Sequence, residues 1–395
     1  MNISIFSYCC ALMFLLLGFH TFGYPLEAEL YEGSQCPAEN GGSGVCRQLP
    51  DCSVLLRETI NGNRRGKTSD RCGFYGFTEI VCCPENIEKK FNVRPADKAC
   101  QKIIEFKKEL EFAAREIENQ TTTRAPRTST NRTEIKLTPF IWNGTHARNG
   151  EFPYAVALGY PNTDGETSDP INYDCGGTLI SSKWILTAAH CVNNRHNKIP
   201  IKVKMGATDI RDAGFESDLD EIISHPAYKR SQVYNDMALI SLKSGGMRSS
   251  GNIGPICLQT RSLQPSDITP DTTIVTVGYG DTENDVKSNK LLKSANLSLV
   301  DTEMCNSSHK ISRSLSRGID DTLICAVDRD TTRRSDACHG DSGGPLVMIS
   351  GKVHTLIGVT AFGNGCGNAD PGAYTSVHAY LDWIESIVWP HRGRS

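Results

Sequence analysis

Three short segments carry side chains that together could perform acyl transfer. Ser342 stands between glycines in "DACHGDSGGPL", His190 lies in "LTAAHC", and Asp236 lies in "NDMALI". A serine hydroxyl attacks a carbonyl group only when a base takes its proton, and that base needs an acid to hold its tautomer and stabilise its charge. These residue types therefore predict nucleophilic catalysis by Ser342, with His190 as the base and Asp236 as the orienting acid.

The order of the three residues along the chain separates two classes of hydrolase. Ser342 and its flanking glycines also satisfy the G-x-S-x-G pattern of an esterase nucleophile elbow, a fold in which the catalytic histidine follows the serine. Histidines do follow Ser342, at positions 354, 378 and 391, but no parallel-sheet framework precedes it. The order His190, Asp236, Ser342 favours a protease.

The elements that position these residues read as short β-strands from Ile141 to the C terminus. Alternating or apolar β-type runs are separated by turn signals, and helical crossovers are absent, which favours antiparallel barrels over βαβ units. One helix is expected at the C terminus, in "VHAYLDWIESIVW". The predicted strands are 153–160, 175–181, 183–191, 201–207, 237–243, 272–280, 292–300, 344–349 and 352–363.

The N terminus and the overall charge restrict the location and the partners. A net charge of −3 over 395 residues, without a long basic run, argues against nucleic-acid binding. The first 26 residues contain no charged side chain and hold the apolar run "CCALMFLLLGF". Residues 1–23 therefore read as a secretory signal peptide, with an uncleaved signal anchor as the alternative. No later segment could span a bilayer, and no membrane partner is expected.

The cysteines predict disulfides. Of 16 cysteines, two lie in the signal segment, and the remaining 14 form an even number in a secreted chain. Six of them fall within 48 residues, a segment too small to bury much apolar surface, so cross-links must restrict its unfolded state. Six cysteines allow 15 pairings, and spacing does not choose among them. Metal binding is disfavoured because no two CxxC units with matching spacing occur.

Residues 85–140 are expected to form a linker of two parts. Apolar residues at three- and four-residue steps from Ile103 to Ile117 predict a helix of about 18 residues, either a spacer docked on its neighbour or a self-association site. The Thr-, Arg- and Pro-rich stretch that follows is expected to be an exposed, cleavable tether. N-glycosylation sequons occur at Asn119, Asn131, Asn143, Asn296 and Asn306.

The three motifs, taken together and in this order, resemble those of a chymotrypsin-fold serine protease over residues 141–395. The six-cysteine segment, residues 34–84, resembles a clip domain, and the combination is similar to arthropod clip-domain serine proteases of the snake and persephone branch. The resemblance implies an all-β, double antiparallel β-barrel with a C-terminal helix, preceded by a small disulfide-rich domain. It implies a secreted endopeptidase acting in an extracellular cascade of immunity or development. The alternative is a clip-type pseudoprotease that acts as a binding cofactor.

The resemblance also implies the roles of further residues. The backbone N–H groups of Gly340 and Ser342 would form the oxyanion hole. Asp336 would lie at the floor of the specificity pocket and select Arg or Lys, and Gly363 and Gly372 would leave that pocket open. Ala337 replaces a serine that often stands beside this aspartate, so Arg is expected over Lys.

Activation is the third implication of the resemblance. Cleavage between Phe140 and Ile141 would free an amino terminus that pairs with Asp341. Because Phe140 does not suit a pocket with a carboxylate, the zymogen is not expected to activate itself. An upstream protease with an apolar pocket is then implied, or cuts at Arg124, Arg127, Arg132 or Lys136 that are followed by trimming. The other partners are a protein substrate, expected to be a downstream protease zymogen, and a serpin-type inhibitor as a further candidate. Sugar at Asn143 would impede insertion of the new terminus.

The family's disulfides fit all 14 cysteines. The family usually has a serine that hydrogen-bonds to the catalytic aspartate, and Ala361 stands at that position here, which predicts weaker support for Asp236. No cofactor or metal is predicted, although the acidic segment Ser217–Glu221, expected to be a loop, leaves calcium undecided. The implied pairs are Cys36–Cys82, Cys46–Cys72, Cys52–Cys83, Cys100–Cys257, Cys175–Cys191, Cys305–Cys325 and Cys338–Cys366.

Overall fold

The structure, a computed structural model, places the chain in two compact units. The first unit is Met1–Val93 and the second is Arg94–Ser395, and each is described by itself. The residues described are 33–38, 42–49, 52, 55, 59, 70–75, 78–84, 93–122, 144–162, 169–193, 199–243, 249–281, 289–294 and 296–390, with the backbone alone at 75 and 117–122. The predicted signal peptide and the Phe140–Ile141 bond lie outside the described residues.

A small antiparallel sheet forms the first unit. Its strands are β1 (Gln35–Pro37), β2 (Ser43–Gln48), β3 (Arg71–Tyr75) and β4 (Thr78–Pro84), in the order β1-β2-β4-β3. Its core consists largely of half-cystines, because so short a segment has few large apolar side chains to bury. Bridges join Cys36–Cys82, Cys46–Cys72 and Cys52–Cys83, the same cysteines that the resemblance pairs.

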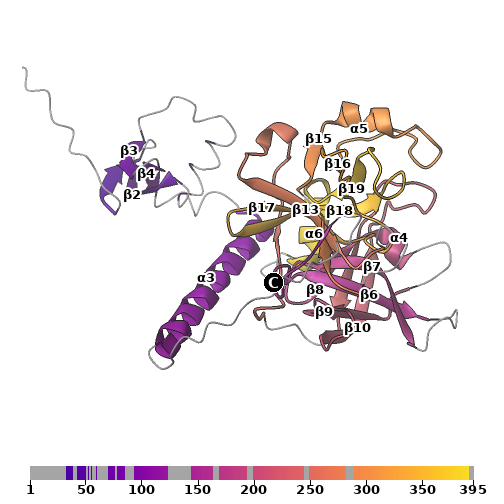
Figure 1. The fold of residues 1–395 in the computed structure, drawn as a ribbon. Coiled ribbons are helices and arrows are strands. Elements are labelled where there is room, and N and C mark those ends of the chain that lie inside the picture. The colour runs from indigo at the N-terminus through magenta and orange to yellow at the C-terminus, as the bar shows by residue number, and fades with distance from the viewer. Residues whose placement is uncertain are drawn as a thin grey trace, which may run out of the picture. The chain divides into compact units, whose positions relative to one another are not determined.

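A closed six-stranded barrel lies in the second unit (Figure 1). Its hydrogen-bonded order is β10-β11-β8-β7-β6-β9. Side chains of β6, β8 and β11 are buried along most of each strand, which explains their continuous apolar sequences. The strands are β6 (Ala155–Pro161), β7 (Ile171–Leu179), β8 (Trp184–Thr187), β9 (Lys202–Met205), β10 (Phe215–Ser224) and β11 (Ala238–Leu242).

A second sheet follows the barrel along the chain. Its order is β15-β16-β19-β18-β17-β13-β14-β5, and β12 pairs in parallel with β18. Apolar side chains of both sheets join in one core cluster, in which Val156 and Leu186 of the barrel accompany Val275 and Val347 of the second sheet. The strands are β5 (Thr145–His146), β12 (Cys257–Leu258), β13 (Thr272–Gly278), β14 (Leu292–Lys293), β15 (Ser298–Val300), β16 (Leu323–Val327), β17 (Pro345–Ser350), β18 (Val353–Phe362) and β19 (Gly372–Ser376).

The predicted all-β, chymotrypsin-like fold with a preceding disulfide-rich domain is confirmed, and three details differ. The second sheet has no ladder that joins its end strands among the described residues, so only the first barrel is closed. The predicted strand 183–191 ends at Thr187, and a helical turn, α4 (Ala189–Val192), follows it. The predicted strand 292–300 is divided into β14 and β15.

The acidic segment expected to be a loop is part of β10, so that prediction was wrong. Ser217 is buried and Leu219 packs on the core. Asp218, which lies between them, and Asp220, which follows Leu219, are exposed. This alternation has the period of a strand. Asp218 lies 3.9 Å from Lys243 and Asp220 lies 3.0 Å from Lys183, so strand pairing and ion pairs with other segments set the structure of these acids.

Helices of the second unit lie at its start and its end. The linker helix α3 (Pro95–Thr122) has 28 residues and is longer than predicted, because Pro95 opens it five residues before Cys100. Cys100 is bonded to Cys257, and Arg94 binds Glu385 of the C-terminal helix α6 (Leu381–Val388). The start of α3 is therefore docked, as the spacer interpretation expected. Within the described range, no helix is both long enough and apolar enough to cross a membrane.

The remaining helices are short. A 3-10 turn, η3 (His378–Tyr380), leads directly into α6, and Val377, Leu381, Ile384 and Val388 are all buried. Asp301 caps the helix α5 (Thr302–Ser308) by accepting a hydrogen bond from the Met304 backbone N–H at 2.7 Å. A second 3-10 turn, η2 (Pro265–Asp267), precedes β13.

Candidate active site

His190 and Asp236 are held together by two neighbouring barrel strands. Thr187 at the end of β8 is paired with Ala238 at the start of β11, so the residues just beyond them meet at one edge of the barrel. His190 Nδ1 lies 2.6 Å from Asp236 Oδ2, and the His190 backbone N–H donates to Asp236 Oδ1 at 2.8 Å. Because a carboxylate only accepts hydrogen bonds, Nδ1 carries the proton, and Nε2 is left as a base.

The environment tunes the basicity of His190. Burial opposes protonation of the imidazole, but the charge of Asp236 and its hydrogen bond outweigh burial, so the pKa of His190 is raised. The Asp236 side chain is 7% exposed and the His190 side chain 32% exposed. An imidazole that is partly open to solvent and backed by a buried carboxylate suits a general base.

Ser342 lies in the turn that precedes β17 and contacts the elements that carry His190. Its carbonyl oxygen accepts a hydrogen bond from the Gly176 N–H at 2.8 Å and lies 3.5 Å from Cys191 Sγ. Gly343 has a φ of +75°, and a Cβ there would lie 2.3 Å from Thr187 Oγ1. Only glycine allows this approach, which holds the serine turn against Thr187, three residues before His190.

The hydroxyl of Ser342 makes no hydrogen bond with His190 Nε2 in the described part of the chain. Nucleophile–base contacts of this kind are commonly loose before a substrate is bound. The structure therefore brings the serine and the histidine to one site and leaves both reacting atoms available.

Two backbone N–H groups beside Ser342 are free to bind a negative charge. Those of Gly340 and Ser342 donate to no other described residue. The carbonyl of His339 accepts from the Asp281 N–H at 2.6 Å, and since a trans peptide directs its two polar groups oppositely, the Gly340 N–H is turned away from Asp281. Gly340 has a φ of +91°, and a Cβ would lie 2.9 Å from Gly280 Cα.

Asp336 lines a cavity of about 240 Å³ that also contains Ser342. Burial raises the pKa of Asp336 to about 7, against the hydrogen bond that its Oδ1 accepts from the Ala337 N–H at 2.8 Å, and the charge of Asp341 raises it further. The position of a Cβ on Gly363 is open, whereas one on Gly372 would lie 3.2 Å from Asp336 Oδ1. The two glycines thus keep the space above the carboxylate empty.

Tyr374 is a pocket residue that sequence reasoning missed. Its side chain is fully buried, it lines the same cavity, and Thr276 is the hydrogen-bonding neighbour of its hydroxyl. A Cβ on Gly372 would lie 3.3 Å from this hydroxyl, so the phenol and the Asp336 carboxylate flank the same glycine. A tyrosine in "GAYTS" reads as a strand residue, and nothing in the sequence signals that its hydroxyl reaches a pocket.

Asp341 is a second buried carboxylate, beneath the serine turn. It accepts hydrogen bonds from the N–H groups of Gly280 at 2.8 Å and Cys338 at 2.9 Å. Burial, its largest influence, raises the pKa of Asp341 to about 7 despite these two bonds. A Cβ on Gly278 would lie 2.1 Å from Asp341 Oδ1, so only glycine admits the side chain. No cation pairs with Asp341 within the described residues, and Phe140 and Ile141 lie outside them.

Disulfides frame the site. Cys175–Cys191 joins β7 to the helical turn that carries His190, and Cys338–Cys366 lines the Asp336 cavity. Sulfur atoms of Cys175 and Cys191 lie within 4.8 Å of a His190 ring nitrogen, an arrangement that suits a metal only if the thiols are free. Here both are oxidised, so this cluster is a bridge and not a set of metal ligands. The third bridge of the protease region is Cys305–Cys325.

Asp236 receives less support than the family pattern offers. Among the described residues its carboxylate accepts two hydrogen bonds, and both come from His190. Ala361 has no hydroxyl to add a third. Thr375 Oγ1 instead donates to the backbone carbonyl of Asp236 at 3.2 Å.

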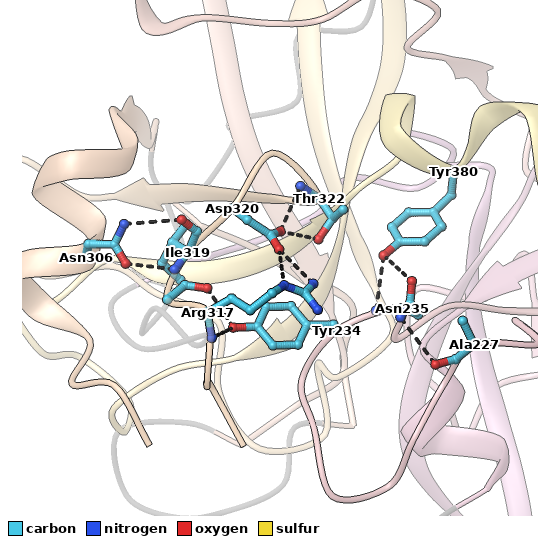
Figure 2. A network of polar contacts seen from close by, with 10 residues as sticks. Ala227, Tyr234, Asn235, Asn306, Arg317, Ile319, Asp320, Thr322 and Tyr380 are labelled. Carbon is cyan, nitrogen blue, oxygen red and sulfur yellow. Dashed lines mark hydrogen bonds and ion pairs between the residues drawn. The ribbon is translucent and has the colours of Figure 1, made fainter. Parts of the chain in front are cut away.

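The structure describes the side chains of two predicted glycosylation sites, Asn296 and Asn306. Asn296 is exposed, and its Oδ1 accepts from the Ile274 N–H at 2.8 Å. Asn306 is also exposed and exchanges two hydrogen bonds with the Ile319 backbone, at 2.7 and 3.2 Å (Figure 2). Asn131 and Asn143 fall outside the described residues, and only the backbone is described at Asn119.

Known proteins resemble this chain over most of its length. Residues 141–384 match the trypsin family, described as "Trypsin". "Serine protease snk" of Drosophila melanogaster is 32% identical over 370 residues, which cover 91% of this chain and 80% of that protein. "CLIP domain-containing serine protease C9" of Anopheles gambiae is 26% identical over 389 residues, covering 95% and 92%. "Serine protease Hayan" of Drosophila melanogaster is 36% identical over 267 residues, covering 64% of this chain and 40% of that protein.

The matched range and the geometry agree. The trypsin match includes His190, Asp236 and Ser342, which the fold brings to one edge of the closed barrel. The relatives that match nearly the whole chain extend the similarity through the cysteine-rich first unit. This chain belongs to the trypsin family of serine endopeptidases, as a clip-domain serine protease.

Proposed function

We propose that this endopeptidase cleaves peptide bonds after arginine. The observation that carries the proposal is the buried Asp336 carboxylate in the cavity that also contains Ser342. A cationic side chain suits this cavity because a neutral one would leave a buried charge without a partner. The scissile carbonyl that follows such a side chain would then lie beside Ser342.

The catalytic steps follow from the groups around that carbonyl. Ser342 Oγ attacks the carbonyl carbon while His190 Nε2 takes the hydroxyl proton, and the buried Asp236 stabilises the imidazolium. The oxyanion accepts hydrogen bonds from the N–H groups of Gly340 and Ser342. His190 then gives its proton to the departing amine, which leaves an acyl-enzyme. Water, deprotonated by His190, releases the acid and restores Ser342.

Arginine is preferred over lysine because of the donors and acceptors in the pocket. A guanidinium group carries five N–H donors in a planar fork that can bind the Asp336 carboxylate through two parallel hydrogen bonds. A lysine ammonium has a shorter reach and commonly relies on a hydroxyl at the position that Ala337 occupies. The pocket therefore offers arginine the larger number of hydrogen bonds.

The single chain is a zymogen, activated by cleavage between Phe140 and Ile141. Asp341 supports this, because its buried carboxylate has two N–H donors and no described cation. The amino group of Ile141, once free, would supply the missing charge and fix the turn that carries Gly340 and Ser342. Phe140 does not complement Asp336, so another protease with an apolar pocket makes the cut.

The protein is secreted and acts in an extracellular cascade of immunity or development. An uncharged, apolar N terminus and seven disulfides support secretion. Similarity to "Serine protease snk" and "CLIP domain-containing serine protease C9" supports a protease with a clip domain ahead of its catalytic domain. Its partners are the activating protease, a protein substrate such as a downstream zymogen, and a serpin-type inhibitor.

The test uses the full-length chain with an enteropeptidase site in place of residues 136–140, so that cutting leaves Ile141 as the new terminus. Arginyl, lysyl and phenylalanyl amides are assayed before and after cutting, beside Ser342→Ala. Hydrolysis of the arginyl amide that begins on cutting and is absent in Ser342→Ala supports the proposal.

Three results count against parts of it. Activity before cutting contradicts the zymogen. A preference for the phenylalanyl amide contradicts the role of Asp336. No activity after a cut verified by N-terminal sequencing favours a pseudoprotease that acts as a binding cofactor.

A further inference from the structure

Asn235, the residue before Asp236, has a left-handed backbone with a φ of +56°. Among the described residues other than glycine, only Arg334 shares a positive φ. Side chains with a Cβ seldom adopt this conformation, and asparagine is one of the few that tolerate it. Such a conformation persists only where its surroundings hold it, so the contacts of Asn235 show what fixes the approach to Asp236.

Tyr380 and Ala227 hold Asn235 from two sides (Figure 2). The Tyr380 hydroxyl accepts a hydrogen bond from the Asn235 backbone N–H at 3.1 Å and donates to Asn235 Oδ1, also at 3.1 Å. Asn235 Nδ2 donates to the Ala227 carbonyl at 3.2 Å. One hydroxyl thus binds both the main chain and the side chain of the strained residue.

The Tyr380 side chain is itself fixed. It is 5% exposed, it ends the 3-10 turn η3, and its ring meets that of His225 edge to face with 5.1 Å between the centroids. Val377, one turn earlier, is completely buried. A hydroxyl on so rigid an element can define the position of the group that it binds.

Because Asn235 directly precedes Asp236, the fixed position of Asn235 also restricts the position of Asp236. The Asn235 carbonyl accepts from the Met237 N–H at 2.9 Å, so a tight turn encloses Asp236. Thr375 binds the Asp236 carbonyl, and the carboxylate is bonded to His190 alone. Because no hydroxyl at position 361 orients the carboxylate, its direction depends on the backbone that carries it.

A separate set of contacts secures the chain just before Asn235. The Arg317 guanidinium lies 3.7 Å over the Tyr234 ring and binds Asp320. The Tyr234 hydroxyl accepts a hydrogen bond from the backbone N–H of Arg317 at 2.7 Å and donates one to the Gly318 carbonyl at 2.8 Å (Figure 2). The bonds of this anchor run between Tyr234, Arg317 and Gly318, and the Tyr380 hydroxyl adds a contact with Thr322, which binds Asp320. The bonds of Tyr234 itself do not use the Tyr380 hydroxyl, so they remain when that hydroxyl is removed.

We propose that Tyr380 and Asn235 are a positioning pair, which holds the Asp236 carboxylate against His190. Tyr380 acts from η3, the turn that precedes the C-terminal helix α6. The inference rests on the proposed catalytic roles of His190, Asp236 and Ser342. Neither Tyr380 nor Asn235 touches the reacting atoms. Their effect on the reaction passes through Asp236.

The test compares Tyr380→Phe and Asn235→Gly with the parent in the full-length chain cut ahead of Ile141. Tyr380→Phe removes the hydroxyl and keeps the ring, while Asn235→Gly keeps the left-handed backbone accessible and removes the side-chain bonds. The control is Tyr154→Phe, which removes the hydroxyl of another buried tyrosine. That hydroxyl is hydrogen-bonded at 2.8 Å to His354 Nδ1, and neither Asn235 nor Asp236 takes part in this bond.

Both variants are expected to lower kcat on the order of ten-fold, against roughly 10⁴-fold when the aspartate of a triad is replaced. KM should stay within about two-fold, since substrate contacts are unchanged. The acid limb of kcat/KM against pH should move to lower pH, because a displaced carboxylate raises the pKa of His190 less. Tyr154→Phe should change none of these readouts.

Unchanged kcat and an unchanged acid limb in Tyr380→Phe would overturn the positioning pair, provided that the parent hydrolyses the arginyl amide. Equal losses in Tyr154→Phe would overturn it too, because any lost buried hydrogen bond would then have the same effect. A verified cut parent without activity would instead refute the proposed function.

Discussion

Asp336 and Asp341 are buried carboxylates whose charges interact through the protein interior. Burial raises the pKa of each to about 7, and the charge of Asp341 adds to the increase at Asp336. Asp336 faces the cavity that contains Ser342, whereas Asp341 binds the backbone beneath the same turn. The group that would select the substrate and the group that would bind the new amino terminus are therefore electrostatically linked.

The first prediction concerns the pH dependence of cation binding. Asp336 binds an amidinium only when ionised, so protonation at pH below about 7 removes the attraction. In the cut enzyme, the Ki of benzamidine should rise by about ten-fold for each pH unit below the pKa of Asp336. Competition against an arginyl amide measures this between pH 5.5 and 9. A Ki that does not change over this range would contradict the assignment of Asp336.

The second prediction concerns Asp336→Ser. Leaving a buried cation without its partner costs about 2–5 kcal/mol, so kcat/KM for an arginyl amide should fall by roughly 30- to 4,000-fold. The rate at which a small fluorophosphonate labels Ser342 should change little, because that reagent does not use the pocket. Comparable losses in both measurements would mean that Asp336 supports the fold of the site and does not select the substrate.

The third prediction concerns the stability of the uncut chain. The folded-state pKa of Asp341, about 7, lies above its ordinary value of 3.8, so the folded state binds more protons between these pH values. The carboxylate must therefore make the uncut chain less stable as pH rises from about 4 through 7. Asp336 acts in the same direction, and Asp341→Asn removes only the contribution of Asp341.

Thermal unfolding of the uncut chain at pH 5.5 and pH 8 measures this contribution. The fall in Tm between the two pH values should be smaller in Asp341→Asn than in the parent. Asparagine also loses one accepted hydrogen bond, but that loss is the same at both pH values. A pH dependence of Tm identical to that of the parent would show that Asp341 does not titrate as described.

The fourth prediction concerns Phe140→Arg. An arginine before Ile141 suits the Asp336 pocket, so this chain should cut itself between residues 140 and 141 during purification, whereas the parent should remain a single chain. Reducing gels and N-terminal sequencing give the result. The double variant Phe140→Arg with Ser342→Ala is the control and should stay uncut. A Phe140→Arg chain that stays intact under the same conditions would weaken the pocket assignment.

Sequence alone could predict candidate side chains whose chemistry is local. His190, Asp236 and Ser342 stand in short motifs in a telling order, and Asp336 follows from the resemblance; the structure places His190 against Asp236 and Ser342 beside the same cavity as Asp336. Strands with continuous apolar runs, such as β6 and β11, were also predictable, because burial on both faces leaves an unmistakable composition.

The features that sequence missed depend on contacts between distant segments. The acidic segment Ser217–Glu221 of β10 was expected to be a loop, and its partners Lys183 and Lys243 come from other segments of the chain. The burial of the Tyr374 hydroxyl and the strained backbone of Asn235 also arise from tertiary packing. Neither has a local sequence pattern, since the residues that create each environment lie far away along the chain.

The most direct test of the account is covalent labelling of Ser342 by a peptidyl-arginine diphenyl phosphonate, located by mass spectrometry. The account predicts one adduct per chain, on Ser342, formed after the cut ahead of Ile141 and not before. The adduct should be lost in His190→Ala and strongly reduced in Asp336→Ser. Equal labelling by the phenylalanine analogue, or an adduct on another residue of the active cut enzyme, would contradict it.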